Sequence, residues 1–166
     1  MPKLIKLTGH DLAWADDVFT DVADEDAIPE GPVILSLQRF VAEGDALLSG
    51  NRAVGVRVET SEAVEDLAYD LPRIAVVALV FPKFRDGRHY SSARILRERL
   101  GYTGEVRAVG DVLLEQAVFM LRCGFDTFAP ADGSTPEDWA AAGSRYRHVY
   151  QRATDDRAPA FVERAG

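Results

Sequence analysis

The stretch IAVVALVF, residues 74–81, decides the fold of this chain. Every side chain in it is apolar, and valine recurs. A short run with no polar alternation is typical of a central parallel strand that is buried on both faces. The segment that follows, 82–91, is polar and rich in cations, and residues 92–100 return to a helical pattern. The sequence therefore predicts a strand, a polar loop and a helix at the centre of the protein.

Shorter patterns on either side of this unit continue the alternation of strand and helix. Helices are predicted at 36–49, 61–71, 92–100, 111–123 and from 135 to between 146 and 150, and strands at 53–58, 74–81, 105–109 and 126–129. This alternation favours a mainly parallel sheet with right-handed crossovers. About four strands are too few for a closed eight-stranded barrel. We predict a single α/β domain, either a flavodoxin-like sandwich or a partial (β/α) barrel, with an N-terminal and a C-terminal helix.

Composition divides the chain into three parts. Residues 1–31 form an acidic N-terminal arm, in which positions 11–30 carry eight Asp or Glu and no Lys or Arg. Such an arm either lies over the domain or docks on a basic partner. Residues 32–150 form the α/β domain, and residues 151–166 form a loose C-terminal tail.

Length and charge limit the functional class. The 166 residues fit one domain, and the net charge of -8 argues against nonspecific nucleic-acid binding and against an anionic membrane surface. No apolar run approaches the roughly 20 residues that span a bilayer. The single cysteine, Cys123, excludes an intrachain disulfide and a Cys-based zinc finger. The first residues lack the apolar segment of a secretory signal, so we expect a cytoplasmic protein.

Residues 83–107 reverse the charge of the chain. They contain seven Lys or Arg and three Asp or Glu, a net charge of +4. Because α/β proteins bind ligands at the carboxyl ends of their strands, a cationic loop after the central strand predicts an anion site. Guanidinium groups, serine hydroxyls and the amides of a helix start can hold a sulfate, phosphate or carboxylate. The predicted anion-binding residues are Lys83, Arg85, Arg88, Ser91, Ser92 and Arg107.

Each of these features also has a purely structural interpretation. Asp86 opens a turn signal, Ser91 caps the following helix, and the arginines of 92–100 are solvated charges. Arg107 lies in mid-strand, where it either pairs with Asp86 or Asp111 or points into a polar site. Asp111 is well placed to cap the next helix. If the chain is an enzyme, Asp86 and Asp111 are the candidates for a general base.

The sequence predicts no cofactor and no metal site. The three histidines are isolated from one another, and no nucleotide-binding glycine motif occurs. The helix at 111–123 is apolar on most sides, so residues 112–121 are a candidate homodimer face. Cys123, at the end of that helix, is expected to be buried and inert.

Four runs of sequence resemble one bacterial family. FPKFRDGR (81–88), LRERLGY (96–102), RAVGDV (107–112) and RCGFD (122–126) follow one another in the order and spacing of the domain of unknown function 934 family, over residues 32–129. His89 stands where that family usually has glycine. The resemblance implies a cytoplasmic protein that is often encoded beside assimilatory sulfite reductase and commonly labelled an oxidoreductase. No established catalytic residues come with it.

The resemblance and the cationic loop together suggest a function. We expect an accessory protein of sulfite or sulfate reduction that binds a small oxyanion, or the acidic surface of a partner such as sulfite reductase. An enzyme that uses the same strand-end loops is the first alternative. A structural dimeric module is the second.

Overall fold

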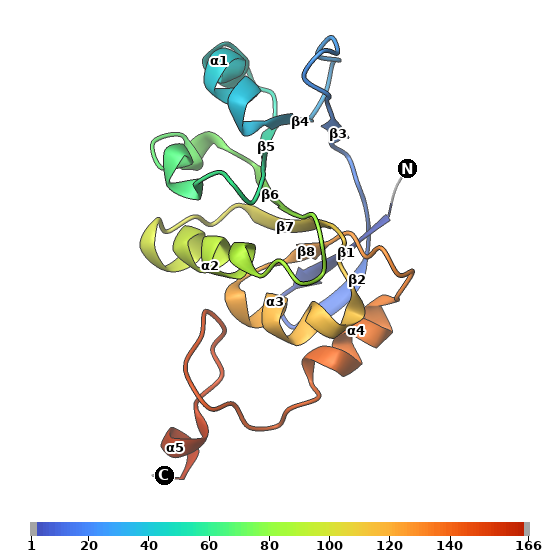
Figure 1. Ribbon diagram of the computed structural model, residues 1–166, viewed down its shortest axis with the longest axis vertical. Coiled ribbons are helices and arrows are strands. Elements are labelled where there is room, and N and C mark those ends of the chain that lie inside the picture. Colours follow the sequence, from blue (N-terminus) through green and yellow to red (C-terminus); the bar gives the residue numbers. More distant parts are fainter. Residues whose placement is uncertain (1–2, 165–166) are drawn as a thin grey trace.

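One curled sheet organises the molecule, which the computed structural model describes over residues 3–164. Within these residues eight strands are joined in the order β2-β1-β8-β7-β6-β5-β4-β3 (Figure 1). They are β1 (Lys3–Thr8), β2 (Asp11–Asp16), β3 (Thr20–Asp21), β4 (Val33–Ser36), β5 (Val54–Val58), β6 (Val76–Phe81), β7 (Glu105–Gly110) and β8 (Thr127–Phe128). Strands β3 to β8 are parallel, whereas β1 pairs antiparallel with β2 and β8.

The helices follow the strands in turn. They are α1 (Leu37–Leu48), α2 (Arg88–Arg94), α3 (Ala117–Cys123), α4 (Pro136–Gly143) and α5 (Ala160–Glu163), with 3-10 turns η1 (Val64–Leu67), η2 (Leu71–Arg73) and η4 (Leu114–Gln116) and a π turn η3 (Ile95–Arg99). Consecutive parallel strands that are direct neighbours, joined by right-handed crossovers, place their helices on one face of the sheet. Figure 1 shows α2, α3 and α4 together on that face.

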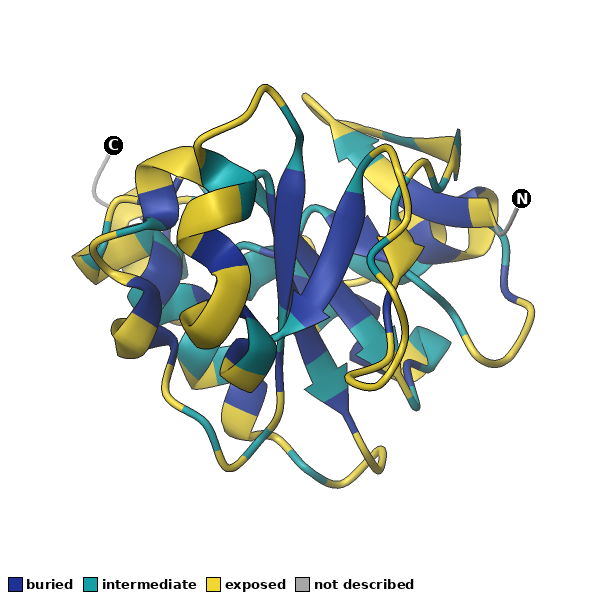
Figure 2. Ribbon diagram, turned by 90° about the horizontal axis from the view of Figure 1, so that it is seen from above, coloured by how far each residue is buried: buried dark blue, intermediate teal, exposed yellow. Residues whose placement is uncertain are grey.

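The core lies between this helical layer and the sheet. Val77, Leu79 and Phe81 of β6 point toward the helices and belong to the main apolar cluster. Val76 and Ala78 point to the opposite face, where they form a smaller cluster. The central strands are buried along most of their length, as the dark ribbons of Figure 2 show. The predicted doubly buried central strand is therefore confirmed, although it begins at Val76 and not at residue 74.

The predicted α/β class is confirmed, but the prediction of about four strands was wrong. The described residues form eight strands because residues 3–36 add four of them. Strand β2 lies at the sheet edge and has only four apolar residues between two aspartates, and β3 has only two residues, so neither produces a long apolar run. The order of β3 to β8 has no reversal, unlike the flavodoxin-like order.

Several helix boundaries differ from those predicted. The segment 61–71 forms the 3-10 turn η1 rather than an α-helix, and η2 starts only at its last residue. Pro72 prevents a regular helix from continuing through this point. Helix α4 starts at the predicted capping box of Thr135 and Asp138, but it ends at Gly143. The residues beyond it run away from the sheet toward α5 (Figure 1). Arg122 anchors this tail through a 3.0 Å contact of its Nε with Asp155 Oδ2.

Candidate functional site

The loop after β6 is tied to the loop after β7. Asp111 Oδ2 accepts a hydrogen bond of 2.8 Å from the backbone N–H of Phe84. The backbone N–H of Asp111 in turn donates to the carbonyl of Phe81 at 2.7 Å. Gly110 allows this approach, since its φ is +92° and a Cβ there would lie 2.4 Å from the Phe81 carbonyl oxygen. The two strand ends therefore form one braced edge.

Asp111 does not cap a helix. The next helical turn, η4, begins at Leu114, and Leu113 before it is extended. The prediction of an N-cap at Asp111 was wrong because its carboxylate already accepts from the loop opposite. Sequence reasoning missed this contact, since it joins residues 27 positions apart.

Arg88 is held within its own loop. Its Nε and Nη2 donate to Asp86 Oδ1 at 2.9 Å and to Asp86 Oδ2 at 2.6 Å, and Nη2 also reaches Thr60 Oγ1 at 2.9 Å. Hydrogen bonds from the Arg88 side chain lower the pKa of Asp86 to about 2. Arg88 therefore joins the loop after β6 to the loop after β5. Thr60 is a member of this arrangement that the sequence patterns did not single out.

The two serines do not lie at the start of α2. That helix begins at Arg88 behind Gly87, which makes no side-chain capping bond, so the predicted Ser91 cap was wrong. Ser91 is exposed in the second turn. Ser92 Oγ lies 3.2 Å from Nδ1 of His89 and so belongs to the environment of that ring.

His89 is a buried side chain beneath the loop. Its ring contacts Phe81 edge to face, with 5.9 Å between the ring centroids. Burial lowers the pKa of His89, and the nearby Val58 carbonyl offsets part of that effect. The imidazole is therefore neutral at pH 7 and acts as packing between the ends of β5 and β6.

Arg107 lies apart from the cationic loop. It points to the face of the sheet opposite the helices, where its side chain is 4% exposed. Its Nη1 contacts Asp17 Oδ2 at 2.9 Å and its Nε contacts Glu105 Oε1 at 2.8 Å, so the pairing proposed with Asp86 or Asp111 was wrong. The Phe19 ring lies 5.6 Å from the guanidinium carbon. The segment between β2 and β3 thus crosses this face and neutralises Arg107.

Lys83 and Arg85 are the predicted site cations that remain available. Both are exposed, and within residues 3–164 neither side chain has a hydrogen-bond or ion-pair partner. Phe84 stands between them with 44% of its surface exposed. We call these three residues the cationic tip. It is the part of the predicted site that projects from the braced edge.

A comparison with protein-family models matches residues 55–161, more than half of the chain. The matching family is described as a bacterial protein of unknown function, DUF934. The chain belongs to this family. The predicted resemblance is confirmed, but the match begins at residue 55 rather than 32 and reaches further into the tail than residue 129. The search of curated proteins and the search of solved structures gave no match.

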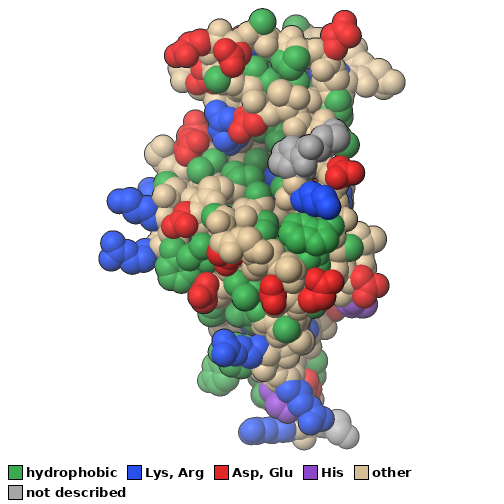
Figure 3. Space-filling model, turned by 90° about the vertical axis from the view of Figure 1, so that its right-hand side faces the viewer, with side chains coloured by type: hydrophobic (Ala, Val, Ile, Leu, Met, Phe, Trp, Pro, Cys, Tyr) green, Lys and Arg blue, Asp and Glu red, His purple; other side chains and the backbone are tan. Residues whose placement is uncertain are grey.

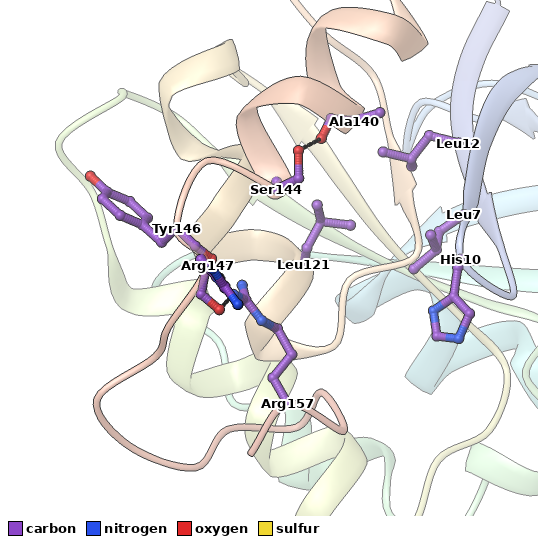
Figure 4. A pocket seen from close by; sticks show the side chains of 10 residues that line it. Leu7, His10, Leu12, Leu121, Ala140, Ser144, Tyr146, Arg147 and Arg157 are labelled. Atoms are coloured by element: carbon purple, nitrogen blue, oxygen red, sulfur yellow. Dashed lines mark hydrogen bonds between the residues drawn. The ribbon is translucent and has the colours of Figure 1, made fainter. Parts of the chain in front are cut away.

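In this DUF934 chain the cationic tip does not line the hollow drawn in Figure 4. That hollow, of about 390 Å³, lies between the β1–β2 hairpin, α3, α4 and the tail. It is at the amino ends of the parallel strands, because the carbonyl of Asp126, just before β8, accepts from Leu7 on the hairpin. In Figure 4, Arg157 reaches the backbone at Arg147, with a hydrogen bond of 3.1 Å.

Three further features bear on the class of site. Within residues 3–164 no cluster of three or more His, Cys, Asp or Glu is arranged to hold a metal ion. None of the described helices is both long and apolar enough to cross a membrane. Cys123 is half-buried, and burial raises the pKa of its thiol, which disfavours the reactive thiolate.

Proposed function

We propose that this chain is an accessory protein of assimilatory sulfite reduction that docks on an acidic surface of a partner protein. The cationic tip of Lys83, Phe84 and Arg85 makes the contact. The observation that carries this proposal is the pair of uncompensated cations on a braced edge in a chain of net charge -8. The pathway comes from the family resemblance, which also favours sulfite reductase as the partner and the cytoplasm as the location.

A partner surface fits the tip better than a small oxyanion does. An oxyanion site requires the predicted cations to converge, yet Arg88 is paired with Asp86 and Arg107 lies on the opposite face of the sheet. Lys83 and Arg85 line none of the hollows described. Two exposed cations around an exposed aromatic ring are instead typical of a protein interface, where arginine and aromatic residues are enriched.

The same contacts favour binding over catalysis. Asp86 is held as a carboxylate by Arg88, and its pKa of about 2 makes it a weak general base near neutral pH. One carboxylate oxygen of Asp111 already accepts a hydrogen bond from the backbone N–H of Phe84. Both candidates therefore serve to shape the loop that carries the tip.

A growth experiment tests the proposed pathway and the tip together. A strain lacking this gene should grow poorly on sulfate and normally on cysteine. The wild-type gene should restore growth on sulfate, whereas the variant Lys83→Glu/Arg85→Glu should not, because it reverses the charge of the tip. The variant Arg147→Glu/Arg152→Glu makes the same charge change at exposed sites away from the tip and should complement fully. Full complementation by the tip variant would overturn the proposal.

A further inference from the structure

An aromatic groove opens beside the cationic tip. It lies between the loop after β6, α2 and α3 and has a volume of about 470 Å³. Its walls are Phe84, Tyr90, Glu115, Gln116, Phe119 and Cys123. Phe119 is 59% exposed although it belongs to an otherwise well-covered apolar helix, and Tyr90 packs edge to face on it with ring centroids 6.4 Å apart. Phe84 is shared between the groove and the tip.

Gln116 gives the groove a polar group that lacks a partner. The residue is only 2% exposed, and its Oε1 accepts a hydrogen bond of 2.8 Å from the backbone N–H of Leu113. Its Nε2 is buried and has no hydrogen-bond partner among the described residues. Burial raises the pKa of Tyr90, and the nearby Gln116 amide offsets part of this rise. The amide and the Tyr90 hydroxyl nevertheless do not meet hydrogen-bond geometry.

These observations define the chemistry of an occupant. A buried donor without an acceptor is costly, so a ligand that offers a carbonyl oxygen to Gln116 Nε2 is favoured. The aromatic walls favour an apolar side chain next to that carbonyl. Lys83 and Arg85 flank Phe84 in the chain and favour carboxylates on either side of it. Glu115, which is exposed on the α3 side, disfavours a second acidic group there.

We propose that the groove binds an acidic segment of a partner protein through one apolar anchor side chain. The anchor packs between Phe84 and Phe119, a main-chain carbonyl of the segment accepts from Gln116, and neighbouring carboxylates pair with the cationic tip. This inference rests on the proposed docking function and names the form of the partner's surface. Cys123 contributes an apolar wall.

Titration of the full chain with model peptides, followed by NMR, tests this arrangement. The probes are two acidic pentapeptides with two carboxylates on each side of a central residue, phenylalanine in one and alanine in the other. The phenylalanine peptide should bind at least about tenfold more tightly, because its ring is buried in the groove. It should also shift the side-chain amide signals of Gln116, and the alanine peptide should not.

Two variants locate the contact. Phe119→Ser replaces an exposed side chain, so it should fold normally and remove the preference for phenylalanine while weak charge-dependent binding persists. Gln116→Met removes the donor without burying a charge, so it should weaken binding of the phenylalanine peptide about tenfold. Val41→Ser, which replaces an exposed apolar residue of α1, is the matched control and should change nothing.

The outcomes separate this inference from the function on which it rests. Equal binding of the two peptides, lost in Lys83→Glu/Arg85→Glu, would leave the cationic tip intact as a docking site and overturn the groove. Absence of binding by both peptides would count against both. A wild-type chain that is dimeric by light scattering and monomeric as Phe119→Ser would show that a second copy of the chain fills the groove, which also overturns the proposal.

Discussion

At the scale of single residues, Asp111 shows how one side chain shapes the candidate site. Its carboxylate holds the backbone N–H of Phe84, and so fixes the loop from which Lys83 and Arg85 project. We predict that Asp111→Ala loses about 1 kcal/mol of unfolding free energy in urea, as expected for a partly exposed charge-assisted hydrogen bond. Asp111→Asn keeps an acceptor oxygen and should stay close to wild type.

Hydrogen exchange gives a sharper measure of the same contact. The Phe84 amide should exchange faster in Asp111→Ala and remain protected in Asp111→Asn. Unchanged protection in the alanine variant would show that Asp111 does not hold the loop.

His89 predicts how stability depends on pH. Burial lowers its pKa in the folded chain below the ordinary value of about 6.5, so the unfolded chain binds the proton more readily. The free energy of unfolding should therefore fall as the pH drops below about 6.5, down to the lowered pKa of the folded state. Asp86 and Arg88 are the charged groups beside it, and their opposite effects are smaller than that of burial.

Urea unfolding at a series of pH values between neutral and mildly acidic measures this effect. His89→Asn should be less stable at neutral pH but should flatten the pH dependence in that window. His10→Asn changes an exposed histidine and should leave the wild-type slope. An unchanged slope in His89→Asn would contradict the assignment.

At the scale of elements, Arg107 joins β7 to the acidic segment between β2 and β3. Removing it leaves Asp17 without its partner and leaves Glu105 with Lys6 alone. We predict that Arg107→Met lowers the unfolding free energy by about 3 kcal/mol, because breaking a buried ion pair leaves an uncompensated buried charge. Arg94→Met breaks an exposed pair with Glu98 and should cost less than about 1 kcal/mol. Similar losses of unfolding free energy in the two variants would contradict the role of Arg107 in joining β7 to the segment between β2 and β3.

The elements also show what the sequence could reveal. The apolar run of β6 and the capping box before α4 carry their structure locally, and both were predicted. Strand β2 was missed because its four apolar residues lie within an acidic block, which was interpreted as an N-terminal arm, whereas pairing with β1 makes it an edge strand. The sequence also contains no sign that Asp17 pairs with Arg107, because the two residues lie 90 positions apart.

The candidate site likewise has a part that the sequence predicts and a part that depends on the fold. The sequence located the loop and its cations, because these residues are consecutive in the chain. It did not reveal that the Arg88 side chain is hydrogen-bonded to Asp86 and Thr60, or that Asp111 accepts from the backbone of Phe84. Such contacts depend on how the ends of the strands meet. The aromatic groove also needed the fold, because Phe84 and Phe119 lie in different elements.

At the scale of the whole molecule, some charges are paired inside the protein and others remain free to meet a partner. On the face opposite the helices, Arg107 is neutralised internally by Asp17 and Glu105. Figure 3 shows both acidic and basic side chains on the surface that it presents. The cationic tip at the carboxyl edge keeps its charge for an external partner. A molecule of net charge -8 can therefore attract an acidic surface at one place while repelling it elsewhere.

The affinity of the purified chain for purified assimilatory sulfite reductase of the same organism tests this central claim most directly. Measured calorimetrically, binding should occur at low ionic strength and weaken as salt is added. It should disappear in Lys83→Glu/Arg85→Glu and persist in Arg147→Glu/Arg152→Glu. Undiminished binding by the tip variant, or no binding by the wild-type chain at low ionic strength, would contradict it.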